Sequence, residues 1–114
     1  MKKKIYISAP LEKQSLENHL KRFLRYARFT FESKAVPVAV HFYVLCFDDE
    51  ARKTLHLSLE ERFSLIWYCD EMWVFGPVVT KDMEREIEFC ENMNMKVLYI
   101  TEKEVKKRLG DKEK

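Results

Sequence analysis

The chain has 114 residues, which is enough for a single domain with one hydrophobic core and leaves no room for a second. Hydrophobic residues make up 46% and aromatic residues 13% of the sequence, so a packed interior is expected. The 21 Lys and Arg residues nearly balance the 19 Asp and Glu residues, and a net charge of +2 argues against a nucleic-acid partner, which usually requires a strongly basic surface.

Strand and helix signals alternate four times along the chain, beginning with a β-rich run at residues 4–8. The next segment carries apolar residues at helical spacing between Leu16 and Phe31, which predicts an amphipathic helix. Residues 36–44 form a second apolar, β-branched run. Pro37 within it fits only at the start of a strand or on an edge strand, because proline cannot donate to a central ladder.

The second half of the chain continues the alternation with clearer helix starts. Ser58 and Glu61 form a capping box, which opens a helix that carries Leu59, Phe63 and Ile66 inward. The remaining predicted elements are a strand at 72–76, a helix capped by Thr80 that runs to about 94, a strand at 97–100, and a helix capped by Thr101 that ends near Gly110.

Four short strands separated by helices cannot pair as hairpins, so they predict a mostly parallel sheet with helices on both faces. We therefore expect a single-domain, three-layer α/β/α fold over residues 1–114, with four or five strands, of the flavodoxin-like or Rossmann-like kind. Ligands of such sheets bind outside the carboxyl ends of the strands. Those ends fall at residues 8–10, 41–43 and 76–80 and at Thr101.

Motifs for several common chemistries are absent. Glycine occurs only at positions 76 and 110, which excludes a glycine-rich dinucleotide turn and a P-loop. The three histidines lack metal-ligand spacing, and Cys46, Cys69 and Cys90 form no C-x-x-C pair, so we expect no metal and no cofactor. Reduced thiols, no visible signal peptide and no apolar run of membrane-spanning length predict a cytoplasmic protein without a membrane partner.

One carboxylate falls on the apolar side of its own predicted helix. At 100° per residue, the residues on the arc that faces the sheet are Met83, Ile87, Cys90 and Met93. Glu86 lies within that arc, where a carboxylate must be paired or must titrate at a raised pKa. Close to a helix N-terminus it is a reasonable nucleophile or base. The alternative is a rim position, in which Glu86 reaches solvent or pairs with Arg52 or Arg85.

Other candidate residues have structural interpretations as well. Asp70 lies just before the third strand, where a loop or cap residue is the favoured interpretation. His41, near the end of the second strand, is more often a hydrogen-bonded core histidine than a catalyst. Tyr6 alternates with two isoleucines, so it faces the other side of the sheet and either packs there or serves a site. The aromatic residues expected to pack in the core are Trp67, Trp73 and Phe75.

Four blocks of sequence, in this order, resemble one known superfamily. They are YISAP (Tyr6–Pro10), PVAVH (Pro37–His41) followed by Asp48 and Asp49, CDEMWVFG (Cys69–Gly76), and TKDMEREI (Thr80–Ile87). Taken together, from residue 5 to residue 100, they resemble the nucleoside 2-deoxyribosyltransferase-like superfamily, and within it a branch of small bacterial and phage proteins.

The resemblance implies an N-glycosidic chemistry. In that superfamily a glutamate on the helix after the third strand attacks C1′ of a 2-deoxyribosyl group and releases the base, and the sugar then passes to another base or to water. Glu86 matches this glutamate, Tyr6 matches the tyrosine that orients it, and Asp70 matches the aspartate that serves the leaving base. The resemblance implies a sugar pocket formed by Ser8, Ala9, Pro10, His41, Phe75, Gly76, Thr80, Asp82 and Met83.

Two positions depart from the pattern of the branch, so other functions stay open. Asp82 stands where glycine is usual, and its charge should disfavour a 5′-phosphate; Val40 stands where proline is usual. The alternatives to an enzyme are a nucleoside- or nucleotide-binding module without turnover and a self-associating protein without a small-molecule role. Because members of the superfamily build pockets across subunits, we expect a homo-oligomer, a dimer or larger, with a nucleoside or nucleotide as its small-molecule partner.

Overall fold

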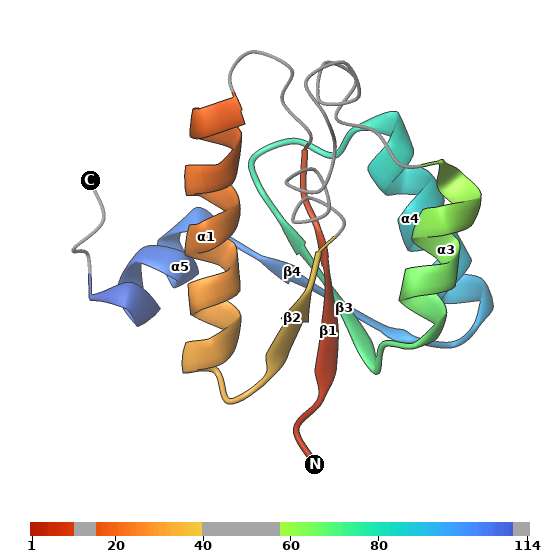
Figure 1. Ribbon diagram of the computed structural model, residues 1–114, viewed down its shortest axis with the longest axis horizontal. Helices are drawn as coiled ribbons and strands as arrows, with labels where there is room; N and C mark the ends of the chain where they lie inside the picture. The colour runs from red at the N-terminus through yellow and green to blue at the C-terminus, as the bar shows by residue number, and fades with distance from the viewer. Residues whose placement is uncertain (11–15, 40–57, 111–114) are drawn as a thin grey trace.

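A computed structural model of the chain describes residues 1–10, 16–39 and 58–110. At its centre is a four-stranded sheet in the order β2-β1-β3-β4, with every neighbouring pair parallel (Figure 1). The strands are β1 (Lys4–Ser8), β2 (Val36–Val38), β3 (Glu71–Phe75) and β4 (Lys96–Ile100). In the central pair Tyr6 lies opposite Met72 and Ser8 lies opposite Val74.

Helices cover both faces of the sheet. In the part of the chain that the structure describes they are α1 (Leu16–Glu32), α3 (Leu59–Trp67), α4 (Lys81–Asn92) and α5 (Glu102–Leu109). Helices α1 and α5 lie together on one face, and α3 and α4 lie together on the other (Figure 1). This arrangement confirms the predicted three-layer α/β/α fold. None of these helices is both long and apolar enough to span a membrane.

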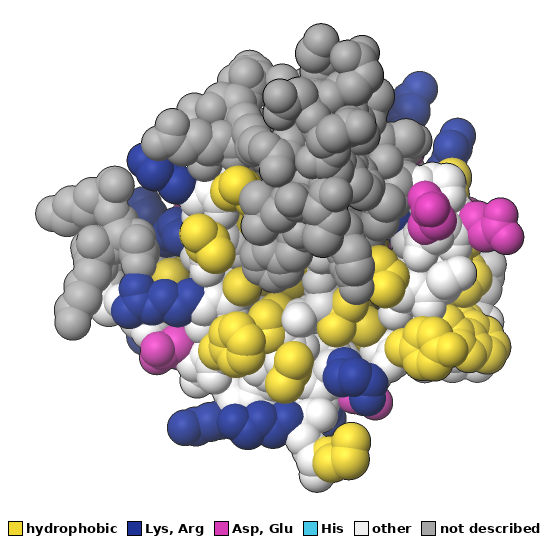
Figure 2. Space-filling model, in the orientation of Figure 1, with side chains coloured by type: hydrophobic (Ala, Val, Ile, Leu, Met, Phe, Trp, Pro, Cys, Tyr) yellow, Lys and Arg dark blue, Asp and Glu magenta, His cyan; other side chains and the backbone are white. Residues whose placement is uncertain are grey.

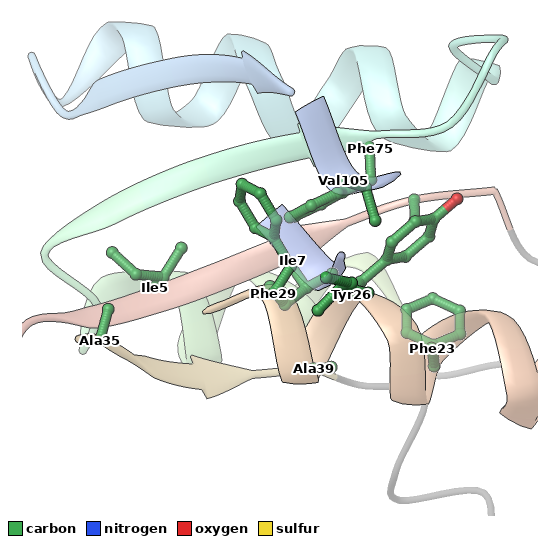
Figure 3. Close-up of a cluster of buried hydrophobic side chains, with 11 residues drawn as sticks. Ile5, Ile7, Phe23, Tyr26, Phe29, Ala35, Ala39, Phe75 and Val105 are labelled. Atoms are coloured by element: carbon green, nitrogen blue, oxygen red, sulfur yellow. The ribbon is translucent and has the colours of Figure 1, made fainter. Parts of the chain in front are cut away.

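The sheet separates two hydrophobic clusters. Because successive side chains of a strand point to opposite faces, Ile5 and Ile7 pack toward α1 and α5, whereas Tyr6 packs toward α3 and α4. Figure 3 shows the first cluster, in which the rings of Tyr26 and Phe75 stack with their centroids 4.5 Å apart. The second cluster surrounds Tyr6 and consists of Ile66, Cys69, Met72, Val74, Met83, Ile87 and Cys90.

The predicted helix caps are present. Ser58, Thr80 and Thr101 each accept a hydrogen bond from the backbone N–H three residues later. Gly110 ends α5 in the left-handed region, with φ of 75°. The cap at Thr80 fixes where α4 begins, and therefore which of its side chains face the sheet.

The structure corrects one packing expectation and shortens one strand. Trp67 was expected in the core, but its side chain is 67% exposed. Arg62 and Ile66 form the inward face of α3, and Trp67 lies 100° beyond Ile66, so it turns to solvent. Strand β2 spans Val36–Val38, whereas the predicted strand covered residues 36–44. Residues 40–44 lie outside the described residues. Pro37 lies on an edge strand, as expected.

Candidate functional site

Strand β1 presents two hydroxyl groups to the α3–α4 side of the sheet. Tyr6 and Ser8 are two residues apart, so their side chains share a face, and both are fully or almost fully buried. The Tyr6 hydroxyl donates a hydrogen bond to Glu86 Oε2 at 2.7 Å. The Ser8 hydroxyl donates to Glu86 Oε1 at 2.8 Å. Both oxygens of the Glu86 carboxylate are therefore held from the carboxyl half of β1.

Helix α4 supplies the carboxylate. Its buried residues are Met83, Glu86, Ile87 and Cys90, which confirms the inward arc predicted from the sequence. Glu86 is 5% exposed and lies in the second turn after the Thr80 cap. The rim interpretation of Glu86 is therefore wrong. Among the described residues its cationic neighbour is not the exposed Arg85, and Arg52 lies outside the described residues.

A buried arginine on α3 completes the cluster. The Arg62 side chain is 1% exposed, and its Nε lies 3.4 Å from Glu86 Oε2. Its Nη2 lies 3.4 Å from Asp82 Oδ2, on the first turn of α4. Neither nitrogen has a hydrogen-bond partner among the described residues, so both contacts are ion pairs without a formed hydrogen bond. We call Tyr6, Ser8, Arg62 and Glu86 the Glu86 cluster.

The sequence reasoning missed Arg62, although a usable signal was present. Arg62 and Ile66 are four residues apart, so they share a face of α3. The same helical geometry that placed Glu86 on the inward arc of α4 places Arg62 inward on α3. A charged residue on an apolar arc in each of two predicted helices would have indicated a buried pair.

Burial dominates the electrostatics of the cluster. Desolvation raises the pKa of Glu86 above its ordinary value, while hydrogen bonds from Tyr6 and Ser8 and the charge of Arg62 act in the opposite direction. Burial, together with the adjacent carboxylate, raises the pKa of Tyr6 well above its ordinary value. The Tyr6 phenol therefore stays protonated at neutral pH and remains a hydrogen-bond donor.

The loop after β3 packs closely against the end of β1. Gly76 has φ of 101°, a conformation that favours glycine, and a Cβ built there would lie 2.8 Å from Pro10 Cδ. Two of the expected pocket residues, Pro10 and Gly76, are thus in direct contact. This contact fixes the loop that leads to Thr80 and to the first turn of α4.

The structure does not bring Asp70 to the Glu86 cluster. Asp70 lies at the amino end of β3, where its carboxylate accepts a hydrogen bond from the Lys4 backbone N–H at 2.7 Å. Because Val74 is the residue that pairs with Ser8, Asp70 lies about 13 Å along the strand from that level. The backbone bond to Lys4 lowers the pKa of Asp70, which favours a structural role at this exposed end.

The other expected pocket residues divide between the two faces of the sheet. Asp82 joins the cluster through Arg62, and Met83 is buried on the same side. Ala9 and Phe75 belong to the α1–α5 cluster on the opposite face. Thr80 caps α4, and His41 lies outside the described residues.

The described cysteines do not resemble reactive thiols. Burial raises the pKa of Cys69 to about 11 and that of Cys90 to about 12, so both are protonated at neutral pH. Both are free and buried, whereas Cys46 lies outside the described residues. In residues 1–10, 16–39 and 58–110, no three His, Cys, Asp or Glu side chains are grouped to hold a metal ion.

The fold and the cluster define a class: a parallel α/β domain with a buried carboxylate at the carboxyl end of a central strand, held by two hydroxyls and an arginine. Within that class the chain belongs to the family DUF7768, described as a domain of unknown function, whose family model matches residues 3–100. A comparison with curated proteins found no match.

Proposed function

We propose that this protein cleaves the N-glycosidic bond of 2-deoxyribonucleosides or related nucleotides, by deoxyribosyl transfer or by hydrolysis, with Glu86 as the nucleophile. The observation that carries the proposal is the fixed carboxylate, which receives the Tyr6 and Ser8 hydroxyls at 2.7 and 2.8 Å. The sequence blocks that resemble the nucleoside 2-deoxyribosyltransferase-like superfamily support it, because they match Glu86 to the nucleophile and Tyr6 to its orienting tyrosine.

The reaction divides one difficult displacement into two steps. A Glu86 oxygen forms a bond to C1′ as the bond from C1′ to the base nitrogen breaks, and the base leaves with that electron pair and takes a proton from solvent. Water or a second base then attacks C1′ and gives up its proton to solvent, and Glu86 leaves as a carboxylate. These two steps are the same as in retaining glycosidases, in which a carboxylate captures an oxocarbenium-like centre.

The neighbours of Glu86 have distinct parts in this proposal. The Arg62 charge favours the ionised, nucleophilic form of Glu86 against the effect of burial. The Tyr6 hydroxyl orients the carboxylate. Solvent supplies the proton to the leaving base, because Asp70 is held at the other end of the sheet.

We also propose the substrate type, cofactor requirement, location and oligomeric state expected from the sequence. The substrate is a small molecule, the reaction needs no cofactor, and the protein acts in the cytoplasm as a homo-oligomer in which a neighbouring subunit completes the pocket. Sedimentation of the purified chain checks the last point, since a monomer at all concentrations would contradict it.

A second candidate function is a nucleoside- or nucleotide-binding module without turnover. One observation favours it: Glu86 is 5% exposed and both its oxygens already accept hydrogen bonds. A nucleophile must reach C1′, so an enzyme requires the Ser8 hydroxyl to rotate away from Oε1 when substrate binds. A binding module requires no such movement.

The experiment that separates the two functions measures both base release and binding. Purified protein is incubated with a panel of 2′-deoxynucleosides and their 5′-monophosphates, and free base is quantified by chromatography. We expect base release that falls about a thousandfold or more in Glu86→Gln. Glu88→Gln is the matched control, because Glu88 lies on the same helix, is exposed and undergoes the same change of charge.

Two results of this experiment would contradict the enzyme proposal. Base release that survives in Glu86→Gln would overturn the role of Glu86. Ligand-induced thermal stabilisation without any release of base would favour the binding module over the enzyme.

A further inference from the structure

A cavity lies on the opposite side of the sheet from the Glu86 cluster. It has a volume of about 790 Å³ and is bounded by α1, α5 and Pro77 in the loop between β3 and α4. It shares no described lining residue with the Glu86 cluster. Cavities of this size commonly hold small-molecule ligands.

The cavity concentrates positive charge. Its described charged lining residues are Lys21, Arg22, Arg25 and Arg28 of α1, and Glu102 and Lys106 of α5. Lys21, Arg25 and Lys106 thus face one described carboxylate, whereas Arg22 and Arg28 have further interaction partners. Lys and Arg side chains stand out along the α1–α5 side of the molecule in Figure 2. We call this cavity the basic cavity.

The arrangement on α1 carries an energetic cost. Lys21 and Arg25 are four residues apart, which places them on one face of the helix. Like charges at this spacing repel one another, and Lys106 of α5 adds a further cation to the same cavity. A bound anion would relieve this repulsion, so the cavity favours a negatively charged ligand.

A row of cations on a helix is often only a solvated face, but one contact distinguishes this one. The Arg25 side chain is 21% exposed, and its Nη1 pairs with Glu102 across the α1–α5 interface. The guanidinium is therefore held in place at the cavity rather than free in solvent.

The same cavity has an apolar wall. Leu24, Tyr26 and Pro77 line it beside the charged residues. Leu24 is 59% exposed, whereas Tyr26 is buried and stacks on Phe75. A small inorganic anion would use only the charged side, whereas a molecule with an anionic group and a carbon-rich part would contact both.

We propose that the basic cavity binds a small phosphate-bearing molecule, whose phosphate oxygens contact Lys21, Arg25 and Lys106 and whose remainder lies against Leu24 and Pro77. Guanidinium groups match phosphate oxygens in pairs, and lysines add point charges, so this set of side chains suits phosphate. The chain is nearly neutral overall, which favours a compact ligand over a long nucleic-acid strand.

The first measurement asks whether the cavity binds phosphate compounds. Labelled protein is titrated with inorganic pyrophosphate, adenosine 5′-diphosphate and unphosphorylated adenosine, and backbone amide shifts are followed by NMR. We expect shifts at residues 21–28, 76, 78 and 106 with the two phosphate compounds, tighter binding of adenosine 5′-diphosphate than of pyrophosphate, and no shifts there with adenosine. No binding of either phosphate compound would overturn the proposal.

A matched pair of variants then tests the location. Lys21→Gln/Lys106→Gln removes two exposed cations from the cavity, whereas Lys103→Gln/Lys107→Gln removes two exposed cations of α5 that do not line it. We expect the first variant to weaken pyrophosphate binding tenfold or more and the second to change it less than twofold. Equal weakening in both would show general attraction to a charged surface and would contradict the proposal.

Two further controls complete the design. A single-stranded oligodeoxynucleotide that binds more tightly than adenosine 5′-diphosphate would replace the small molecule with a nucleic-acid strand and overturn the proposal. Glu86→Gln should bind pyrophosphate as the wild type does, so failure of the proposed enzyme activity and failure of the basic cavity are distinguishable.

Discussion

At the scale of single residues, the Glu86 cluster is a buried charge arrangement that depends on all its members. A carboxylate removed from water is unfavourable unless hydrogen bonds and an opposite charge replace the lost hydration. Tyr6 and Ser8 provide the hydrogen bonds, and Arg62 provides the charge. Because Arg62 also pairs with Asp82, the removal of any one charge changes the balance for the others.

The pH dependence of stability follows from the raised pKa of Glu86. A carboxyl group whose pKa is higher in the folded than in the unfolded protein supports folding most below the unfolded pKa, ordinarily about 4.5. That contribution is lost as the pH rises through the folded pKa. The stability of the wild type relative to Glu86→Gln should therefore decrease as the pH rises from about 4.5 to neutrality.

Urea unfolding at a series of pH values measures this difference directly. The exposed Glu88→Gln control should show no such decrease. If the stability of the wild type relative to Glu86→Gln instead increases with pH, the pKa of Glu86 is lowered in the folded protein. That result would contradict burial as the largest effect on this pKa.

Arg62 should be coupled energetically to Glu86. Arg62→Met leaves the Glu86 carboxylate buried without its cation, and loss of one partner of a buried pair costs about 3–5 kcal/mol of stability. In a Glu86→Gln background the same substitution should cost at least about 1 kcal/mol less, because no buried anion remains to be left alone. The unfolding free energies of the wild type, the two single variants and the double variant test this. Equal costs of Arg62→Met in both backgrounds would show that Arg62 and Glu86 are not coupled.

The candidate residues differ in how far the sequence predicted them. Glu86 was predictable because a single charge interrupts an apolar arc, and the burial of Tyr6 followed from strand alternation. The contact between them was implied by the resemblance alone. Asp70 shows the limit of a sequence match. Its position in the motif does not reveal the strand register, which places its carboxylate against Lys4 at the amino end of the strands, away from Glu86.

At the scale of elements, the loop from β3 to α4 positions the site. It begins at Gly76, whose left-handed backbone lies against Pro10, and it ends at Thr80, whose hydroxyl accepts from the Met83 backbone N–H. The direction of α4, and with it the approach of Glu86 to β1, depends on both ends of this short segment.

Gly76→Ala should therefore destabilise the protein. The added Cβ meets Pro10 Cδ at 2.8 Å, and the backbone conformation is unfavourable for alanine, so we expect a cost of about 1–3 kcal/mol. A second substitution, Pro10→Ala, should recover part of this cost by removing the clash, but not the part that belongs to the backbone. Thermal unfolding of the single and double variants measures both parts. No loss of stability in Gly76→Ala would contradict the observed close contact.

Most elements were predicted correctly because their signals are local. Strand β1 and the starts of α3, α4 and α5 follow from apolar periodicity and from Ser58, Thr80 and Thr101, which lie within a few residues of the elements they define. Trp67 was misplaced because its exposure depends on which face of α3 meets α4. The inward face is centred on Arg62 and Ile66, and Trp67 lies outside it.

At the scale of the whole molecule, the strand order β2-β1-β3-β4 explains why the Glu86 cluster and the basic cavity lie on opposite faces of the sheet. This order places α1 with α5 on one face of the sheet and α3 with α4 on the other. The basic cavity forms where α1 meets α5, and the Glu86 cluster forms where α3 and α4 meet β1. The alternation of strands and helices predicted the layers, but it did not predict which helices share a face. The basic cavity was missed for that reason.

In the proposed reaction Glu86 carries a 2-deoxyribosyl group during turnover, so this group should be detectable on the protein. The wild type and Glu86→Gln are mixed with a 2′-deoxynucleoside identified in the base-release panel, quenched rapidly in acid and digested for peptide mass spectrometry. We expect a deoxyribosyl ester on Glu86 in the wild type and none in the variant. Base release without an ester on Glu86, or the same adduct in both proteins, would contradict it.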